Sequence, residues 1–245
     1  MKSLGIIGFG AFGRLAAKEL SGKFSIVVAD AGKIRESAFP ATTIARAAAS
    51  DIVLLCVPIS EIASALRKIS PFVKPGALVM DVSSLKVLAC KLMATILPKA
   101  TRIVGTHPLF GPKSVAADGL IGKTIVLCPV RADKELVQKI ALFVESLGLE
   151  VRRMTPLQHD RDAAKSQALH TFLLKALEKT AIRSATLPLA SRLKLLEAMD
   201  FVRGDSEQLY WDMQTLNPFA FAQRKNLIAL LEKLDNELVR KSWAK

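Results

Sequence analysis

The segment Leu4-Gly5-Ile6-Ile7-Gly8-Phe9-Gly10-Ala11-Phe12-Gly13 decides the fold. Its apolar start predicts a buried strand, and the glycine spacing after it is typical of a turn that opens a helix. Gly8 allows the tight turn, Gly10 lets a pyrophosphate approach the backbone, and Gly13 allows close packing of helix on strand. The N–H groups at the start of such a helix bind phosphate. The segment therefore predicts a dinucleotide site formed by Gly8, Phe9, Gly10, Ala11, Phe12 and Gly13, and a turn that binds nothing is the less favoured interpretation.

An acidic residue, Asp30, ends the second predicted strand, 17 residues after Gly13. A carboxylate near this offset binds the ribose hydroxyls of a dinucleotide and repels a 2′-phosphate. The position therefore favours NAD as the cofactor. Lys33 and Arg35 follow closely and offer cations for a 2′-phosphate, so NADP stays open. A turn residue without a ligand is the alternative for Asp30.

Short apolar runs alternate with helical stretches through residues 1–154. The predicted strands are residues 4–8, 25–29, 52–57, 77–82, 102–106, 124–128 and 150–153. The predicted helices between them are residues 11–20, 59–69, 87–96 and 133–147. This alternation predicts an α/β fold, a Rossmann-like, doubly wound and mostly parallel sheet that forms a dinucleotide-binding domain.

The pattern changes in residues 155–245, where we find no convincing strand. Helical periods are predicted at residues 158–183, 190–202, 206–216 and 218–240. The last of them carries more apolar side chains than a small bundle would expose, at Leu227, Ile228, Leu230, Leu231, Leu234 and Leu238. We therefore expect an all-helical substrate and dimerisation domain, and a homodimer formed through the C-terminal helices.

The charge of the chain indicates the class of ligand. The net charge is +13, but Lys and Arg are spread along the chain without a basic run interleaved with aromatic residues. We therefore expect small anionic ligands and no nucleic acid.

The three cysteines are widely spaced in apolar segments, which predicts buried thiols and no metal site. No apolar stretch approaches the ~20 residues that span a bilayer, and Met1 leads directly into a predicted strand. We expect a cytoplasmic location and no membrane partner.

Three further segments follow predicted strands, at the sheet edge where ligands bind in such folds. Val57-Pro58 ends one strand, and Asp81-Val82-Ser83-Ser84-Leu85-Lys86 ends the next. Thr106-His107-Pro108-Leu109-Phe110-Gly111-Pro112 ends the strand after that. A hydroxyl, an ammonium and an imidazole are thus predicted to lie at one edge, beside the cofactor.

Together these segments resemble the prephenate/arogenate dehydrogenases of tyrosine biosynthesis, and the plant-type arogenate dehydrogenases most closely. The resemblance covers nearly the whole chain. It extends to His159-Asp160, Ala163-Ala164-Lys165-Ser166-Gln167 and Gly204-Asp205-Ser206. It implies NAD(P)-dependent oxidative decarboxylation of a cyclohexadienyl acid, arogenate or prephenate. Hydride leaves the hydroxyl-bearing carbon, and loss of carbon dioxide then makes the ring aromatic.

The resemblance also implies roles for residues at the sheet edge. His107 is the base, or hydrogen-bond acceptor, for the substrate hydroxyl, and an unperturbed imidazole pKa of about 6.5 suits that task. Ser84 orients the hydroxyl or His107, although a helix N-cap is a serious alternative for this serine. Lys86 fixes the loop or the cofactor. Val57, Pro58 and Ser83 are expected to contact the cofactor.

In the helical half, His170 stands where the family has a second substrate-site histidine, with Gln167 as a polar contact. Arg203 is the nearest candidate for gripping a substrate carboxylate, and a cation at a helix C-terminus is its alternative. Asp160 is the candidate partner for the ammonium of arogenate, or else a solvent-facing carboxylate in the first helical turn. His159 is expected to cap or pack rather than react.

Two other classes of protein stay open. Another two-domain dehydrogenase or reductase, acting on a hydroxy acid or an imine, would use a lysine on the first long helix after the sheet, such as Lys165. That interpretation leaves the His107 motif unexplained. A non-catalytic dinucleotide-binding or nucleic-acid-binding protein would account for the positive charge and would show salt-dependent DNA binding without turnover.

Overall fold

The computed structural model describes residues 1–34 and 37–242, so Arg35 lies outside the described residues. The chain forms two compact units, Met1–His159 and Asp160–Lys245. They divide within helix α7 (Pro156–Ala163), five residues after residue 154, where the change of sequence pattern had been expected. Each unit is described by itself below.

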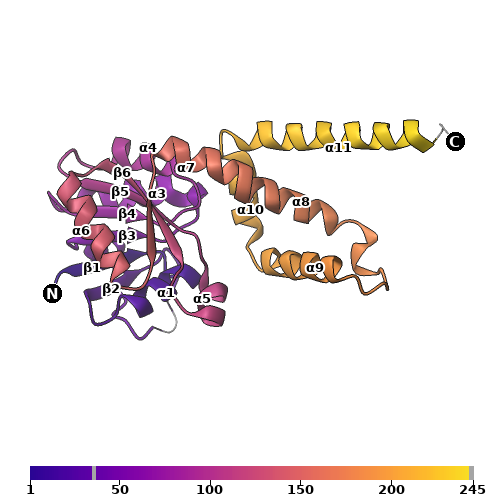
Figure 1. Ribbon diagram of the computed structural model, residues 1–245. Coiled ribbons are helices and arrows are strands. Elements are labelled where there is room, and N and C mark those ends of the chain that lie inside the picture. Colours follow the sequence, from indigo (N-terminus) through magenta and orange to yellow (C-terminus); the bar gives the residue numbers. More distant parts are fainter. Residues whose placement is uncertain (35–36, 243–245) are drawn as a thin grey trace. The chain divides into compact units, whose positions relative to one another are not determined.

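The first unit is built on a seven-stranded sheet, as predicted (Figure 1). Its strands follow the spatial order β2-β1-β3-β4-β5-β6-β7, and β6 is antiparallel to β5 while all other neighbours are parallel. The strands are β1 (Ser3–Ile7), β2 (Ser25–Ala29), β3 (Ile52–Leu55), β4 (Leu78–Asp81), β5 (Arg102–Pro108), β6 (Thr124–Arg131) and β7 (Glu150–Arg153). The carboxyl ends of β1 to β5 therefore share one edge, and the order reverses between β1 and β3, where ligands bind in such sheets.

Helices cover the two faces of this sheet. They are α1 (Ala11–Glu19), α2 (Ile44–Ala48), η1 (Ile59–Glu61), α3 (Ile62–Ile69), η2 (Ser70–Phe72), α4 (Val87–Ile96), α5 (Pro112–Asp118) and α6 (Lys134–Glu145). Helices α2, α3 and α4 pack along one face, and α1 and α6 lie on the other, each over its own cluster of buried apolar side chains. The short helices α2 and α5 were not predicted.

Helix α6 shows how the sequence produces one of these elements. The Asp133 carboxylate accepts a hydrogen bond from the Leu136 N–H at 2.7 Å and so caps the helix start. Ile140 and Val144, four residues apart, are buried on the face turned to the sheet. The helix predicted at residues 133–147 is confirmed at residues 134–145.

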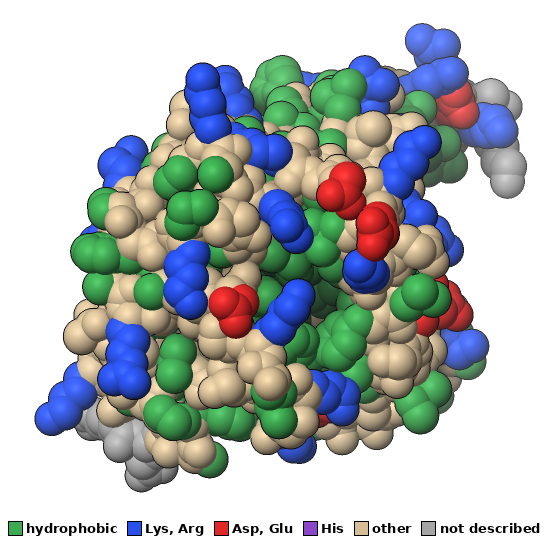
Figure 2. Space-filling model, turned by 90° about the vertical axis from the view of Figure 1, so that its left-hand side faces the viewer, with side chains coloured by type: hydrophobic (Ala, Val, Ile, Leu, Met, Phe, Trp, Pro, Cys, Tyr) green, Lys and Arg blue, Asp and Glu red, His purple; other side chains and the backbone are tan. Residues whose placement is uncertain are grey.

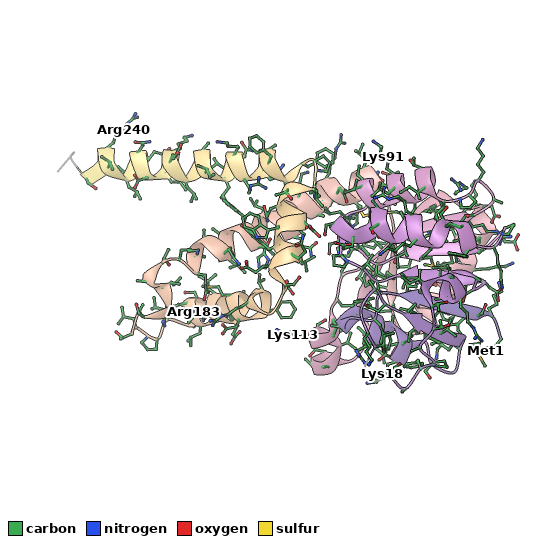
Figure 3. The ribbon with its side chains drawn as sticks, turned by 180° about the vertical axis from the view of Figure 1, so that it is seen from behind. Met1, Lys18, Lys91, Lys113, Arg183 and Arg240 are labelled. Atoms are coloured by element: carbon green, nitrogen blue, oxygen red, sulfur yellow. The ribbon has the colours of Figure 1, made fainter. Side chains whose placement is uncertain are left out.

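The described residues of the second unit form helices joined by short non-helical segments and contain no strand. After α7 come η3 (Ala164–Ala168), α8 (Leu169–Leu177), η4 (Ala181–Arg183), α9 (Ala190–Arg203), α10 (Glu207–Thr215) and α11 (Ala220–Ser242). The helix predicted over residues 158–183 is confirmed as far as Leu177, with the five-residue π-helical segment η3 inside it, and is wrong for residues 178–183, where a turn and a 3₁₀ helix follow. Figure 3 shows side chains projecting from α11 along its length, out to Arg240.

Buried amide groups hold the second unit together. The Gln214 side-chain amide donates to the Ala168 carbonyl at 2.7 Å, and Arg224 donates to the Gln214 carbonyl at 2.7 Å. The Asn217 amide donates to the Asp160 carbonyl at 2.9 Å. These bonds tie α10 and the start of α11 to the segment around η3, because each satisfies a polar group that is buried there. In the described part of the chain, no helix is long and apolar enough to cross a membrane.

Candidate functional site

The glycine turn has the geometry that a dinucleotide requires. Gly8 adopts a φ of +95°, and a Cβ there would lie 2.5 Å from the Cys56 carbonyl oxygen. A Cβ on Gly13 would lie 2.1 Å from the Gly8 oxygen, so only glycine lets α1 approach β1 this closely. A Cβ on Gly10 would meet nothing within 4 Å, which leaves that side of the turn open to a ligand.

Helix α1 presents its N-terminus at this opening. Gly10 is the N-cap residue of α1, and no described side chain accepts a hydrogen bond from the first N–H groups of the helix at this position. The first turn contains no acidic residue. The unpaired N–H groups and the positive end of the helix dipole therefore face the space beside Gly10 without a competing carboxylate. The residues present fit the pyrophosphate of a dinucleotide.

Asp30 lies beside this turn. Its Oδ2 accepts a hydrogen bond from the Phe9 N–H at 2.6 Å, and its Oδ1 accepts one from the Gly32 N–H at 2.8 Å. The two bonds fix the carboxylate at the end of β2, next to the glycine turn. Lys33 is exposed in the loop that follows.

The ends of β4 and β5 are locked together by a buried ion pair. Lys86 and Asp81 are both fully buried, and the Lys86 ammonium contacts the Asp81 carboxylate and donates to the Thr106 carbonyl at 2.6 Å. The Thr106 hydroxyl donates to the Asp81 carbonyl, and Ser83 donates to the Asp81 carboxylate. A buried charge is tolerated when it is paired and hydrogen-bonded, and this network fixes the backbone next to His107.

His107 is 5% exposed, and its Nδ1 lies 2.8 Å from the Nε2 of His159. Burial lowers the pKa of His107 well below 6.5, and the positive charges that His159 and Lys86 can carry lower it further. The imidazole is therefore neutral at pH 7. Because Nδ1 is used by His159, Nε2 is the nitrogen that remains for a ligand.

The other residues predicted for this edge occupy the loops after β3 and β4. Val57 is half-buried and Pro58 is exposed between β3 and η1. Ser83 is buried with its hydroxyl committed to Asp81, while Ser84 is half-buried. The N-cap position of α4 is Lys86, so the N-cap alternative for Ser84 is wrong.

The residues predicted in the helical half are placed as follows within the second unit. His170 is exposed near the start of α8, and Gln167 is half-buried in η3. Arg203 is the exposed last residue of α9, directly before Gly204, as its helix-terminus alternative states. Asp160 is fully buried, so the solvent-facing alternative for this carboxylate is wrong.

Comparison with known families decides the assignment. The family model described as "Prephenate dehydrogenase, nucleotide-binding domain" matches residues 25–153 of the chain. The chain belongs to this family. The match covers β2 to β7 and includes the buried network and His107.

Individual relatives agree with the family match. The chain is 28% identical over 250 residues to arogenate dehydrogenase 1, chloroplastic, of Arabidopsis thaliana, covering 96% of this chain and 39% of that protein. It is 31% identical over 195 residues to arogenate dehydrogenase 2, chloroplastic, of the same plant, covering 77% and 54%. The chain thus spans about half, or less, of the length of these curated relatives.

Among solved structures, the chain is similar in fold to prephenate dehydrogenase from Aquifex aeolicus, in complex with hydroxyphenyl propionate and NAD⁺. The TM-score is 0.79 at 22% identity, and the match covers 99% of this chain and 92% of that chain. The predicted fold class, a Rossmann-like sheet followed by a helical region, is confirmed.

The contact between His159 and His107 was not predicted from the sequence. His159 was expected to cap or pack, and its ring does pack edge-on against that of His107, with 5.0 Å between the centroids, but it also bonds to His107 across 52 positions of sequence. A single histidine early in a helix has no pattern that would reveal such a partner. In the described residues, no group of three or more His, Cys, Asp or Glu side chains is placed to hold a metal ion.

Proposed function

We propose that this chain is an NAD-dependent dehydrogenase that oxidises and decarboxylates a cyclohexadienyl acid, arogenate or prephenate. The proposal is carried by the state of His107. Its imidazole is buried and neutral, and one of its ring nitrogens bonds to His159. It lies at the carboxyl edge of the sheet, which also carries the glycine turn. Family membership supports the same activity.

His107 has a defined task in this reaction. NAD, when bound, supplies the acceptor for the hydride that leaves the hydroxyl-bearing carbon of the substrate. The Nε2 of His107 accepts the hydroxyl proton, which requires that its Nδ1 carries the hydrogen and donates it to His159. His159 is then a positioning residue, because it selects the tautomer in which Nε2 has a lone pair. Ser84 orients the hydroxyl.

We further propose NAD rather than NADP as the cofactor. The fixed carboxylate of Asp30 stands where the ribose hydroxyls of NAD are bound and disfavours a 2′-phosphate. The backbone of residues 8–13 holds the pyrophosphate. Val57, Pro58 and Ser83 complete the cofactor site along the neighbouring loops.

Arogenate is the proposed substrate, supported by the two Arabidopsis relatives that are named arogenate dehydrogenases. His170, Gln167 and Arg203 are the proposed contacts for its polar groups. Asp160 stays the proposed partner of the ammonium, although contact would require neighbouring side chains to move, because its carboxylate is buried.

A second copy of the chain is the proposed partner of α11. Leu227, Leu231, Leu234 and Leu238 follow one another at intervals of four, three and four residues, as in helices that pair. Leu231, Leu234 and Leu238 are 50% to 64% exposed. Pairing of two such helices would remove this apolar surface from water.

Two alternatives make different predictions. A reductase of another substrate class would use Lys165, which is exposed in η3, and would not need His107. A nucleic-acid-binding protein would retain DNA in a gel shift at low ionic strength and lose it as salt rises. The network around His107 has no role in that alternative.

The test is a fluorescence assay of NADH or NADPH formation, with arogenate and prephenate each offered with each cofactor. We expect the highest rate with arogenate and NAD. Background rates in all four reactions, for folded protein that binds NAD in calorimetry, would refute the proposed activity. A faster reaction with NADP than with NAD would refute the role of Asp30 alone.

A further inference from the structure

The first unit contains an elongated apolar groove that the proposed reaction does not use. It lies between α1 and α6, has a volume of about 340 Å³, and we call it the α1–α6 groove. Its floor includes Ile52, Leu78 and Met80, and its walls include Leu15, Ile140 and Phe143. Figure 2 shows an apolar hollow with basic and acidic side chains around its rim. Its volume is within the range of ~300–1,000 Å³ typical of ligand sites.

The topology of the sheet explains why this groove exists. Helix α1 connects β1 to β2, and α6 connects β6 to β7, so each covers one side of the sheet on this face. The helices that follow β3 and β4 pack on the opposite face. The strip of sheet over β3 and β4 is therefore left without a helix of its own. Two clusters of buried apolar side chains meet at this strip, one that includes Leu54 of β3 and one that includes Leu78 of β4.

The groove is long and narrow. Its lining runs along β5 from Arg102 to Pro108, six residue steps, which corresponds to about 20 Å at a rise of about 3.3 Å per residue. Phe12 and Phe110, with ring centroids 6.3 Å apart, line the end near the glycine turn. On the floor, Leu54 and Leu78 are only 8% and 7% exposed. A helix of ~10 Å diameter is too wide to reach them, whereas an alkyl chain is not.

Charged side chains gather at the opposite end, where the strands begin. Lys2 and Arg102 line this end, and neither forms an ion pair or side-chain hydrogen bond within the described residues. Of the other charged groups there, Asp51 bonds to Ser3 and to Lys74, and Lys139 bonds to Glu135. Glu19 is the one carboxylate of the described lining that has no such partner. Among the described residues, this end of the α1–α6 groove therefore has two cations without an ion-pair partner, Lys2 and Arg102, and one carboxylate without such a partner, Glu19.

We propose that the α1–α6 groove binds a linear amphipathic carboxylate, of the class of medium- and long-chain fatty acids. The carboxylate lies between Lys2 and Arg102, and the alkyl chain extends along the floor over Leu78 and Met80 toward Phe12. The apolar lining desolvates the chain, which is the dominant favourable contribution to binding. The cations select an anionic head over a cationic one.

The test uses the full chain and isothermal titration calorimetry. Decanoate is titrated below its micelle concentration, and decyltrimethylammonium, which has the same chain and the opposite charge, is titrated in parallel. We expect saturable binding of one decanoate per chain and at least tenfold weaker binding of the cation. Absence of saturable decanoate binding, or equal binding of the two probes, would overturn the proposal.

Two sets of variants locate the site. Leu15→Trp fills the groove from α1, and Met80→Trp fills it from β4. We expect at least one of the two variants to fold, as judged by circular dichroism. The folded variant should lose decanoate binding. The double change Lys2→Ala/Arg102→Ala should weaken binding by up to about fivefold for each charge, the range of exposed ion pairs. Its matched control is Lys23→Ala/Arg67→Ala, which removes two exposed cations outside the groove. Unchanged binding in a folded filling variant would place the ligand elsewhere and refute the site.

Discussion

The two units of the chain differ in the side chains that they leave exposed. In the first unit, the polar groups Asp81, Lys86, His107 and His159 are less than 10% exposed and bond to one another or to backbone. In the second unit, large apolar side chains are exposed, as on α11, where Leu234 is 56% and Leu238 is 64% exposed. Buried polar networks fix geometry, whereas exposed apolar stripes mark surfaces that are covered by a partner. The comparison indicates that the first unit fixes its buried polar groups by itself, and it makes the exposed stripe of α11 the surface for the proposed second copy.

Replacing the proposed base has the largest expected effect. His107→Asn keeps a group that can bond to His159 but removes the ring nitrogen that accepts the proton. We expect kcat to fall by roughly 10²-fold or more, with NAD affinity and melting temperature near those of the wild type. Steady-state kinetics measures the first and calorimetry the others. The exposed histidine of α8 provides the control, and His170→Asn should cost less. A near-normal kcat for His107→Asn would remove the imidazole from the mechanism.

The glycine turn allows a second test of the first unit. Gly10→Ala places a methyl group in the open space beside the turn, where it meets no protein atom within 4 Å. The fold should tolerate it, but the pyrophosphate loses its close approach to the backbone, and NAD affinity should fall at least about tenfold. Gly111→Ala, which also meets no atom within 4 Å, is the matched control and should bind NAD normally. Equal affinity of both variants would contradict the predicted cofactor position.

The proposed role of α11 in the second unit is tested by placing charges on its exposed leucines. Leu231→Glu/Leu234→Glu should halve the molar mass measured by light scattering, because two charges on each chain would be buried in the paired helices. Lys233→Glu changes an exposed position between them, where the side chain is 73% exposed, and should leave the mass unchanged. A wild-type mass of one chain would show that α11 is not a dimer surface.

The smallest expected effect concerns pH. His107 has a pKa below 6.5 in the folded state, so the unfolded chain binds the proton more readily. The free energy of unfolding should therefore decrease as pH falls below about 6.5, by at most ~1.4 kcal/mol per pH unit from this group. Denaturant titrations at several pH values measure the slope, and His107→Asn should flatten it. The acid limb of the kcat/KM profile should likewise lie below pH 6.5. A limb above that value would contradict a neutral, buried base.

Much of the first unit could be predicted because buried parallel strands are continuous apolar runs. The strand at residues 25–29, which is apolar after Ser25, has the bounds that the sequence indicates. Helices α2 and α5, with five and seven residues, are too short for a periodic pattern to reveal them. The π-helical segment η3 has no sequence signature, since it differs from an α-helix only in its backbone bonding.

The candidate site was predictable where the chain supplies a local motif, as in the glycine turn and the segment around His107. It was not predictable where a contact joins distant residues. His159 meets His107 only because β5 and α7 are brought together by the fold, and no spacing in the sequence records that distance. The Asp81–Lys86 pair lies within one motif, but its burial, which fixes its structural role, follows from strands on both sides.

The central claim is that the neutral His107 serves an oxidation that is coupled to loss of carbon dioxide. Its most direct test is to measure NADH and carbon dioxide released from carboxyl-labelled arogenate in the same reaction. The account predicts one carbon dioxide for each NADH in the wild type and loss of both products together in His107→Asn. Formation of NADH without carbon dioxide, or an unchanged yield of both from the variant, would contradict it.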